Sequence, residues 1–355
     1  TSSRRRAQLE ETEKISNSYD GDLEEVYNEK LGKLNNVTMI KGAPVPQKFY
    51  YVGGTIDTGI VISDNENDKE KYANSTTVGT DLEGNQFVWV PVEDISLMYK
   101  EVVEGEEIKL SGTNVTVDGY SLQRIRPNDN VVGVPPGNSE KNEVREPDLI
   151  ETYDFLEENY KDILGYNSVE EMAQDMVNEY NEMIESIKNY GGFYVGRYEL
   201  TGTLEKPTEK AGVVLTSENS NMYYLKKACY NVANTEYVKS TMIYGCQWDE
   251  ILNWLVNTGA KIENEINVDS SSWGNYNPGT KQETGSNNKY MANNIYDLAG
   301  NHWEFTQEKK STDRMVGRGG SYGYTGDQRP VSYRSNNTPV FSGGGDTTRP
   351  VLIIK

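Results

Sequence analysis

The sequence has very little histidine or cysteine. The chain of 355 residues contains one histidine, His302, and two cysteines, Cys229 and Cys246. One imidazole cannot supply the ligand set of a metal centre that needs several histidines. The two cysteines form no CxxC pattern and no Cys/His cluster, so no zinc site is predicted, and a disulfide between them stays open. A single histidine without a Ser or Cys partner makes no nucleophile dyad, so we expect His302 to be a packed side chain.

The sequence also lacks long apolar runs and an excess of positive charge. No stretch approaches the roughly 18 apolar residues of a membrane-spanning helix. A net charge of −20 and a pI near 4.6 would repel a polyanion, so we expect no nucleic-acid partner. The acidic residues are spread along the chain, as in soluble exported or phage-type proteins. We therefore expect an extracellular, cell-surface or phage-particle location.

Tyrosine is the abundant aromatic residue, with 25 tyrosines against 6 phenylalanines. Tyrosine offers a large contact area with a polar tip and little rotamer entropy to lose, which suits binding surfaces. It also fills half-buried strand positions. Both interpretations stay open at this point.

The first residues form a polar region, 1–43, that we expect to be an arm or helix. Leu9, Leu23 and Leu31 belong to a sparse helical stripe in it. This pattern fits the stem of an anchored or pilin-like protein, or a frayed terminal arm. The chain begins with Thr1 rather than Met, so an upstream signal, membrane anchor or assembly segment is an open expectation.

The rest of the chain, 44–355, is predicted to be one α+β domain. Residues 44–62 are typical of a glycine-punctuated hairpin and residues 86–92 of a strand. Residues 100–190 are predicted to be an insertion that ends in helices. Ser168 and Glu171 match a capping box, and the methionines that follow at helical spacing indicate core packing more than a binding groove.

Three later segments carry a family resemblance. They are Asn294-Ile-Tyr-Asp-Leu-Ala-Gly-Asn-His-Trp-Glu-Phe305, Arg318-Gly-Gly-Ser-Tyr322 and Ser332-Tyr-Arg334. In order and spacing they resemble the core of the formylglycine-generating-enzyme (sulfatase-modifying factor) family. That resemblance implies a variant of the C-type-lectin fold. Phe193–Thr201 and the amphipathic stretch Gln247–Leu255 resemble a strand and a helix of the same family.

The resemblance implies the fold without the family's chemistry. The oxidases of this family use reactive cysteines in the C-terminal part of the domain, where thiolates hold copper. This chain has no cysteine after Cys246. We therefore predict that it is not an enzyme and requires no cofactor. A divergent oxidase that uses Cys229 and Cys246 is the first alternative, and a pilus-like or stalk-like surface subunit is the second.

The resemblance also assigns roles within the motif. Asn301 and Glu304 match positions that bind structural calcium in the family, and hard oxygen ligands suit calcium. The alternative is that these two side chains cap a turn and bond backbone amides. Trp303 is expected in the core. Gly319 and Gly320 are expected to permit a tight backbone conformation.

The region 318–348 is predicted to be the ligand-binding surface. Its Tyr, Ser, Gly, Asn and Asp content is that of a paratope, and its layout resembles the variable proteins of diversity-generating retroelements. Those proteins are rewritten at template adenines, which turns Asn codons into Tyr, Ser, Gly, Asp and others but never into Lys, Glu, Trp or Met. Residues 319–348 contain none of these four, where about six are expected from the composition of the chain.

This interpretation separates varied positions from a scaffold and sets the predicted function. The scaffold would comprise Arg318–Ser321, Tyr333 and Arg334. The function would be non-catalytic binding of a protein or glycan ligand on a cell or phage surface. The predicted ligand-binding residues are Tyr322, Tyr324, Thr325, Asp327, Ser335, Asn336, Asn337, Phe341, Ser342, Asp346 and Thr347.

Overall fold

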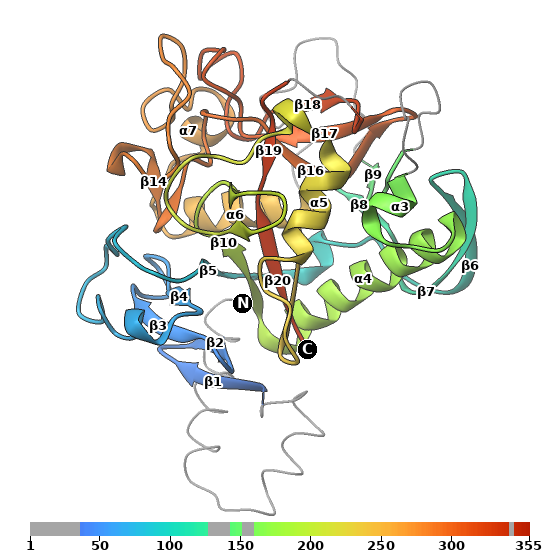
Figure 1. Ribbon diagram of the computed structural model, residues 1–355, viewed down its shortest axis with the longest axis horizontal. Helices are drawn as coiled ribbons and strands as arrows, with labels where there is room; N and C mark the ends of the chain where they lie inside the picture. Colours follow the sequence, from blue (N-terminus) through green and yellow to red (C-terminus); the bar gives the residue numbers. More distant parts are fainter. Residues whose placement is uncertain (1–35, 127–142, 151–159, 341–343) are drawn as a thin grey trace, which may run out of the picture.

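The computed structural model describes residues 36–126, 143–150, 160–340 and 344–355, and it confirms the α+β class (Figure 1). Its largest sheet has six antiparallel strands in the order β13-β20-β10-β5-β4-β3. The last strand of the chain, β20, lies inside this sheet, as expected for a final core strand. The bounds are β3 (Tyr50–Gly53), β4 (Val61–Ser63), β5 (Gln86–Pro91), β10 (Gly192–Gly196), β13 (Val238–Met242) and β20 (Pro350–Ile354).

A second sheet carries the C-terminal loops, at the top of Figure 1. Its order is β18-β17-β16-β19, antiparallel except for the parallel pair β16 and β19. A two-residue turn joins β16 to β17, whereas longer connections lead from β17 to β18 and from β18 to β19 at one end of the molecule. The bounds are β16 (Glu304–Ser311), β17 (Arg314–Arg318), β18 (Arg334–Asn337) and β19 (Thr347–Thr348).

Helix α4 (Val169–Tyr190) forms where the capping pattern predicts it. The Ser168 hydroxyl accepts a hydrogen bond from the backbone N–H of Glu171, and Gly191 ends the helix in a left-handed conformation. The methionine stripe is buried, which confirms the core interpretation. Because α4 packs on β10 and β20 of the main sheet, it belongs to the core. The bounds of the predicted insertion at 100–190 stay a prediction, since an inserted helix can also pack on the main sheet.

Helix α6 (Gly245–Asn257) contacts both sheets, through β5 and β16. Trp248, Ile251, Leu252 and Leu255 lie on its buried face, as the helical spacing predicts. The other helices are α3 (Tyr160–Leu164), α5 (Met222–Tyr230) and α7 (Glu263–Asn267). Within the described residues, no helix is long and apolar enough to cross a bilayer.

Small two-stranded hairpins complete the fold. In the first, β1 pairs with β2 and Ile40 lies opposite Ala43, so the predicted boundary after residue 43 cuts through a hairpin. The predicted arm or helix in 1–35 lies outside the described residues. The bounds are β1 (Val37–Ile40), β2 (Ala43–Pro46), β6 (Val102–Leu110), β7 (Thr113–Tyr120), β8 (Gln123–Ile125), β9 (Glu143–Arg145), β11 (Thr201–Gly202), β12 (Pro207–Thr208), β14 (Met291–Ala292) and β15 (Ile295–Tyr296).

Candidate ligand-binding surface

The motif at 294–305 forms a buried polar frame beneath the C-terminal loops. Asn294 is 1 % exposed and left-handed, with φ 64°. Its side-chain amide donates to the carbonyl oxygens of Thr58, Gly59 and Thr76 at 2.8–3.1 Å. Its oxygen accepts from the backbone N–H of Val78 at 3.0 Å. One side chain therefore joins segments more than 200 residues apart in sequence.

Asn301 has the same kind of structural role. Its side-chain oxygen accepts from the Asn275 amide and from the backbone N–H of Gln282, each at 2.9 Å. Its amide nitrogen donates to Glu199 Oε1 at 2.5 Å. All the polar atoms of this side chain are thus bonded to protein groups. The bond from the Gln282 backbone N–H fits the alternative in which Asn301 bonds backbone amides.

Glu304 is an ion-pair partner inside this frame. Both of its oxygens pair with Arg349, Oε1 with Nε at 2.9 Å and Oε2 with the guanidinium nitrogen Nη2 at 3.2 Å. Burial raises the pKa of Glu304 and the Arg349 guanidinium opposes that rise. Among the described residues, no group of three or more Asp, Glu, His or Cys side chains is arranged to hold a metal ion. A guanidinium is therefore the partner of Glu304 in this structure, and calcium binding at Asn301 and Glu304 stays a prediction.

Residues 318–321 form the base from which the exposed loop leaves. The Arg318 guanidinium donates to Asp249 at 2.8 Å and is fully buried. Gly319 and Gly320 have φ of 94° and 77°, which confirms the predicted tight conformation. A Cβ on Gly320 would come within 2.5 Å of the Arg329 carbonyl oxygen, so a side chain there would displace the loop.

Three aromatic residues and one arginine meet above this base, and Tyr322 beside them packs against His302. We call these five residues the aromatic face: Trp303, Tyr322, Tyr324, Arg329 and Tyr333. The Arg329 guanidinium lies 4.6 Å from the ring centre of Tyr324 and 4.5 Å from that of Tyr333. The rings of Tyr324 and Tyr333 lie 6.2 and 5.9 Å from that of Trp303. Tyr322 and Tyr324 are 37 % and 40 % exposed, so the cluster opens to solvent.

Trp303 is half-buried, which corrects its expected place in the core. Side chains alternate between the two faces along extended chain. Glu304 points inward to Arg349, so its neighbour Trp303 projects to the opposite side, where it meets Tyr324 and Tyr333. Arg329 and Trp303 are the residues of this surface that the sequence analysis missed. An arginine between two tyrosines in a loop was the available signal.

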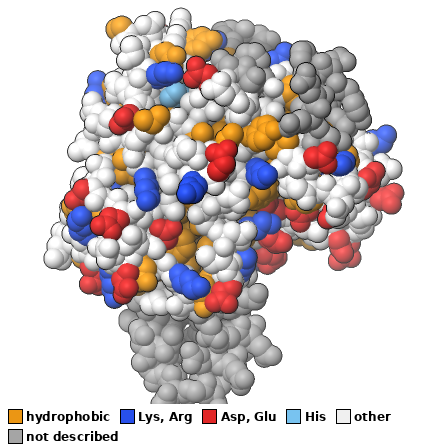
Figure 2. Space-filling view, viewed as in Figure 1, with side chains coloured by type: hydrophobic (Ala, Val, Ile, Leu, Met, Phe, Trp, Pro, Cys, Tyr) orange, Lys and Arg blue, Asp and Glu red, His pale blue; other side chains and the backbone are white. Residues whose placement is uncertain are grey.

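The loop before β19 is held by two contacts beside the aromatic face. His302 Nδ1 lies 2.8 Å from the Gly345 carbonyl oxygen, and because a carbonyl only accepts, this nitrogen carries the proton. Burial lowers the pKa of His302, which favours the neutral ring. The Asn337 amide donates to Asp346 Oδ2 at 2.7 Å. In Figure 2 the pale-blue histidine lies near hydrophobic side chains in the upper part of the molecule.

The structure divides the predicted ligand-binding positions into four groups. Asp346 and Thr347 are buried, because one bonds Asn337 and the other belongs to β19, so a ligand cannot reach them without moving the loop. Phe341 and Ser342 lie outside the described residues. The exposed positions are Tyr322, Tyr324, Asp327 and Asn336, and the half-buried positions are Thr325, Ser335 and Asn337.

Neither cysteine is placed for thiolate chemistry. Cys229 and Cys246 are free thiols and both are buried. Burial raises the pKa of both thiols, and the carboxylate of Glu146 beside Cys246 raises that of Cys246 further. A thiol must ionise to attack or to bind copper. This arrangement does not favour the oxidase alternative.

Comparison with known proteins leaves the family open. No family model matches the chain, and no curated protein matches it. Among solved structures, the chain is similar to Treponema denticola variable protein 1, with 13 % identity over 78 % of this chain and 98 % of that chain, at a TM-score of 0.28. A TM-score of this size does not establish a shared fold, so the resemblance to the formylglycine-generating-enzyme family stays an interpretation of the sequence motifs.

Proposed function

We propose that the chain is a non-catalytic binding protein that presents the aromatic face and the neighbouring polar loops to a protein or glycan ligand. In this proposal its domain is a C-type-lectin fold of the formylglycine-generating-enzyme type. The sequence of residues 319–348 is diversified by a retroelement. The protein acts at a cell surface or on a phage particle.

The observation that carries this proposal is the separation of a fixed base from an exposed face. Arg318, Gly319 and Gly320 are held by an ion pair, by positive φ angles and by close backbone contacts. Tyr322 and Tyr324 follow directly and are exposed. Tyrosines on a rigid base bury large area on binding at a small entropic cost. Changes at these two positions would alter the surface and leave the base intact.

The direct test is deep sequencing of the codons for residues 300–355 across a population of the source organism or phage. The proposal expects substitutions at the exposed and half-buried positions between 322 and 337, all reachable from Asn codons by adenine change. Arg318–Ser321 and Arg349–Lys355 would stay constant. A uniform sequence at all of these codons would contradict diversification by a retroelement and would leave only the proposal of a fixed binding surface. Substitutions spread equally over the base and the face would contradict the whole proposal.

A binding test separates the surface from its diversification. Ligands would be selected from a display library of glycans and surface proteins with the wild-type chain, then measured against Tyr324→Ser and Arg329→Gln. We expect each change to weaken binding at least about tenfold, because stacked aromatic and arginine residues dominate such surfaces. Ligands whose affinity is unchanged by both substitutions would show that binding occurs elsewhere.

A further inference from the structure

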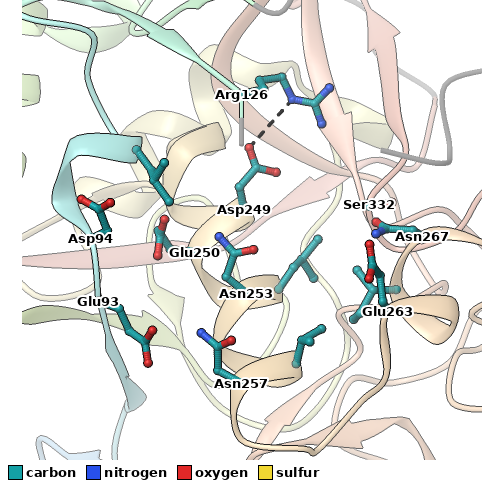
Figure 3. A pocket seen from close by; sticks show the side chains of 14 residues that line it. Glu93, Asp94, Arg126, Asp249, Glu250, Asn253, Asn257, Glu263, Asn267 and Ser332 are labelled. Carbon is teal, nitrogen blue, oxygen red and sulfur yellow. Dashed lines mark ion pairs between the residues drawn. The ribbon is translucent and has the colours of Figure 1, made fainter. Parts of the chain in front are cut away.

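A cavity of about 370 Å³ lies between helix α6, helix α7 and the segment Glu93–Leu97, apart from the aromatic face (Figure 3). Small-molecule sites in proteins commonly enclose about 300–1,000 Å³. Arg126 lies at one end, beside Asp249. The carboxylates of Glu93 and Glu250 lie along the wall. The cavity therefore has walls of both charge signs.

Arg126 has a single, distant carboxylate partner among the described residues. Asp249 already pairs with Arg124 and with Arg318, each at 2.8 Å. Arg126 Nε is 3.9 Å from the same carboxylate and makes no hydrogen bond, although Arg126 is only 6 % exposed. Arg124 is also paired with Glu146 at 3.6 Å and with Glu308 at 3.1 Å, whereas Arg126 has no carboxylate other than Asp249 within 4 Å among the described residues. A buried guanidinium that lines a cavity and has an unsatisfied Nε favours an anionic group of a ligand.

The other titratable side chains on the wall are carboxyl groups. Glu93, Asp94, Glu250 and Glu263 line the cavity, and none of them forms an ion pair within the described part of the chain. Glu250 is 5 % exposed, and burial followed by the neighbouring Asp249 charge raises its pKa to about 8. Asp94 also raises the pKa of Glu250, so these two carboxyl groups lie within electrostatic range, and unpaired carboxyl groups in that arrangement favour a cationic group beside them.

Between the charged groups the lining is suited to a short carbon chain. The amides of Asn253, Asn257 and Asn267 add hydrogen-bonding groups. The apolar side chains of the lining are Leu97, Leu252, Val256 and Ile266. A ligand that matches this order has a carboxylate, an aliphatic segment and at least one ammonium or guanidinium group.

We propose that this cavity binds a dibasic amino acid, with its carboxylate at Arg126 and its cationic groups at the carboxylates of Glu250, Glu93, Asp94 and Glu263. The same chemistry occurs in a free lysine, ornithine or arginine and in the C-terminal lysine or arginine of a peptide. The site is independent of the proposed function of the aromatic face.

The test is calorimetric titration of the full chain with L-lysine and with three analogues, each of which lacks one group. Cadaverine lacks the carboxylate, norleucine lacks the side-chain ammonium, and 6-aminohexanoate lacks the α-ammonium. We expect L-lysine to bind at least about tenfold more tightly than cadaverine and norleucine. Nα-acetyl-L-lysine distinguishes the two sources. Affinity equal to that of L-lysine indicates a peptide C-terminus, and weaker binding indicates the free amino acid.

Two variants locate the site, and a third variant serves as the control. Arg126→Gln should abolish the preference for L-lysine over cadaverine. Glu263→Gln, at the exposed rim, should weaken L-lysine binding about threefold to tenfold without disturbing the fold. Glu205→Gln is the matched control, because Glu205 is exposed and does not line the cavity. Absence of binding at 10 mM, a value above the range of about 1 mM expected for a specific small ligand, would overturn the proposal.

Two further results would also overturn it. If cadaverine binds the wild-type chain as tightly as L-lysine does, Arg126 does not bind the ligand carboxylate. L-Lysine binding unchanged in both Arg126→Gln and Glu263→Gln would place the ligand outside this cavity. If Arg126→Gln fails to fold, Glu263→Gln and the analogue series still decide the question.

Discussion

The polar frame at 294–305 and the region 322–337, which carries most of the aromatic face, have similar compositions and different environments. Both are rich in Asn, Asp, Gly and aromatic residues. Asn294 and Asn301 are 1 % and 0 % exposed, and every side-chain polar group of Asn294 is bonded to a distant segment. Asn336 is exposed on β18. An asparagine in this chain therefore either joins distant segments in the interior or lies on the surface, and the groups that the fold places beside it decide which.

The difference has an energetic cause. A buried amide that loses its partners leaves several groups without hydrogen bonds, each at a cost of about 1–3 kcal/mol. An exposed amide exchanges its partners with water at little cost. The frame therefore resists substitution, whereas the face tolerates it, and this tolerance is what a diversified surface needs.

The largest expected effect breaks the frame. Asn294→Ala leaves the carbonyls of Thr58, Gly59 and Thr76 and the N–H of Val78 without their partner. We expect a loss of about 3–5 kcal/mol in the free energy of unfolding, measured by urea denaturation. Asn336→Ala, on the exposed side of β18, is the matched control and should change the free energy of unfolding by less than about 0.5 kcal/mol. Equal losses in the two variants would contradict the distinction between frame and face.

A smaller effect is expected where the base meets the face. Gly320→Ala places a Cβ at positive φ within 2.5 Å of the Arg329 carbonyl oxygen. We expect a loss of about 1–3 kcal/mol in the same measurement. Gly323→Ala, three residues further, meets only the Ser321 hydroxyl oxygen at 3.7 Å. It should be neutral within about 0.5 kcal/mol, and a Gly323→Ala loss as large as that of Gly320→Ala would show that the loop is rigid beyond its base.

The pH dependence of Asp346 sharpens the boundary of the face. Burial raises the pKa of Asp346 to about 6, against a small opposing effect of Asn337. Between the usual value near 4 and about 6, the folded chain binds the extra proton, so this group lowers the stability as pH rises through that window. Asp346→Asn should therefore raise the free energy of unfolding at pH 7.5 by about 1–2 kcal/mol.

At pH 4 the same substitution should have little effect, because the carboxyl is then protonated in the folded state. Urea denaturation of both proteins at pH 4 and pH 7.5 gives the comparison. A difference that is the same at the two pH values would mean that Asp346 does not titrate in this window.

The smallest effect is expected on the face itself. Tyr322→Ser removes a ring that is 37 % exposed and meets the His302 ring edge-on at 6.3 Å. We expect the free energy of unfolding to fall by less than about 1 kcal/mol, because a partly exposed side chain loses little buried area. Thermal denaturation followed by near-ultraviolet circular dichroism would measure it. A loss above about 3 kcal/mol would place Tyr322 in the frame.

Local patterns predicted much of the fold. The helical spacing of Trp248, Ile251 and Leu252 placed the buried face of α6, and Ser168 placed the start of α4, because amphipathic periodicity and capping act within a few residues. The bounds of the insertion stay a prediction, because no local signal distinguishes a helix that packs on a peripheral hairpin from one that also packs on the main sheet.

The candidate site was predicted in part. The pair Gly319–Gly320 predicted a backbone with positive φ, since few other residue types adopt it readily. The exposed tyrosines followed from composition. Arg329 between two rings, the outward side of Trp303 and the burial of Thr347 did not, because each depends on which strand lies beside which.

The sequence by itself determined the α+β class, the scarcity of ligands for metal chemistry, and the positions of helices and tight turns, since these follow from composition and short-range periodicity. Tertiary structure alone decided that Glu304 pairs with Arg349, that Asn294 joins the 58–59 and 76–78 segments, and that Arg126 lines a cavity with the wall carboxylates. The physical reason is range. Propensity and capping act over a few residues, whereas a buried ion pair or a cavity wall exists only where the packed fold brings distant residues together.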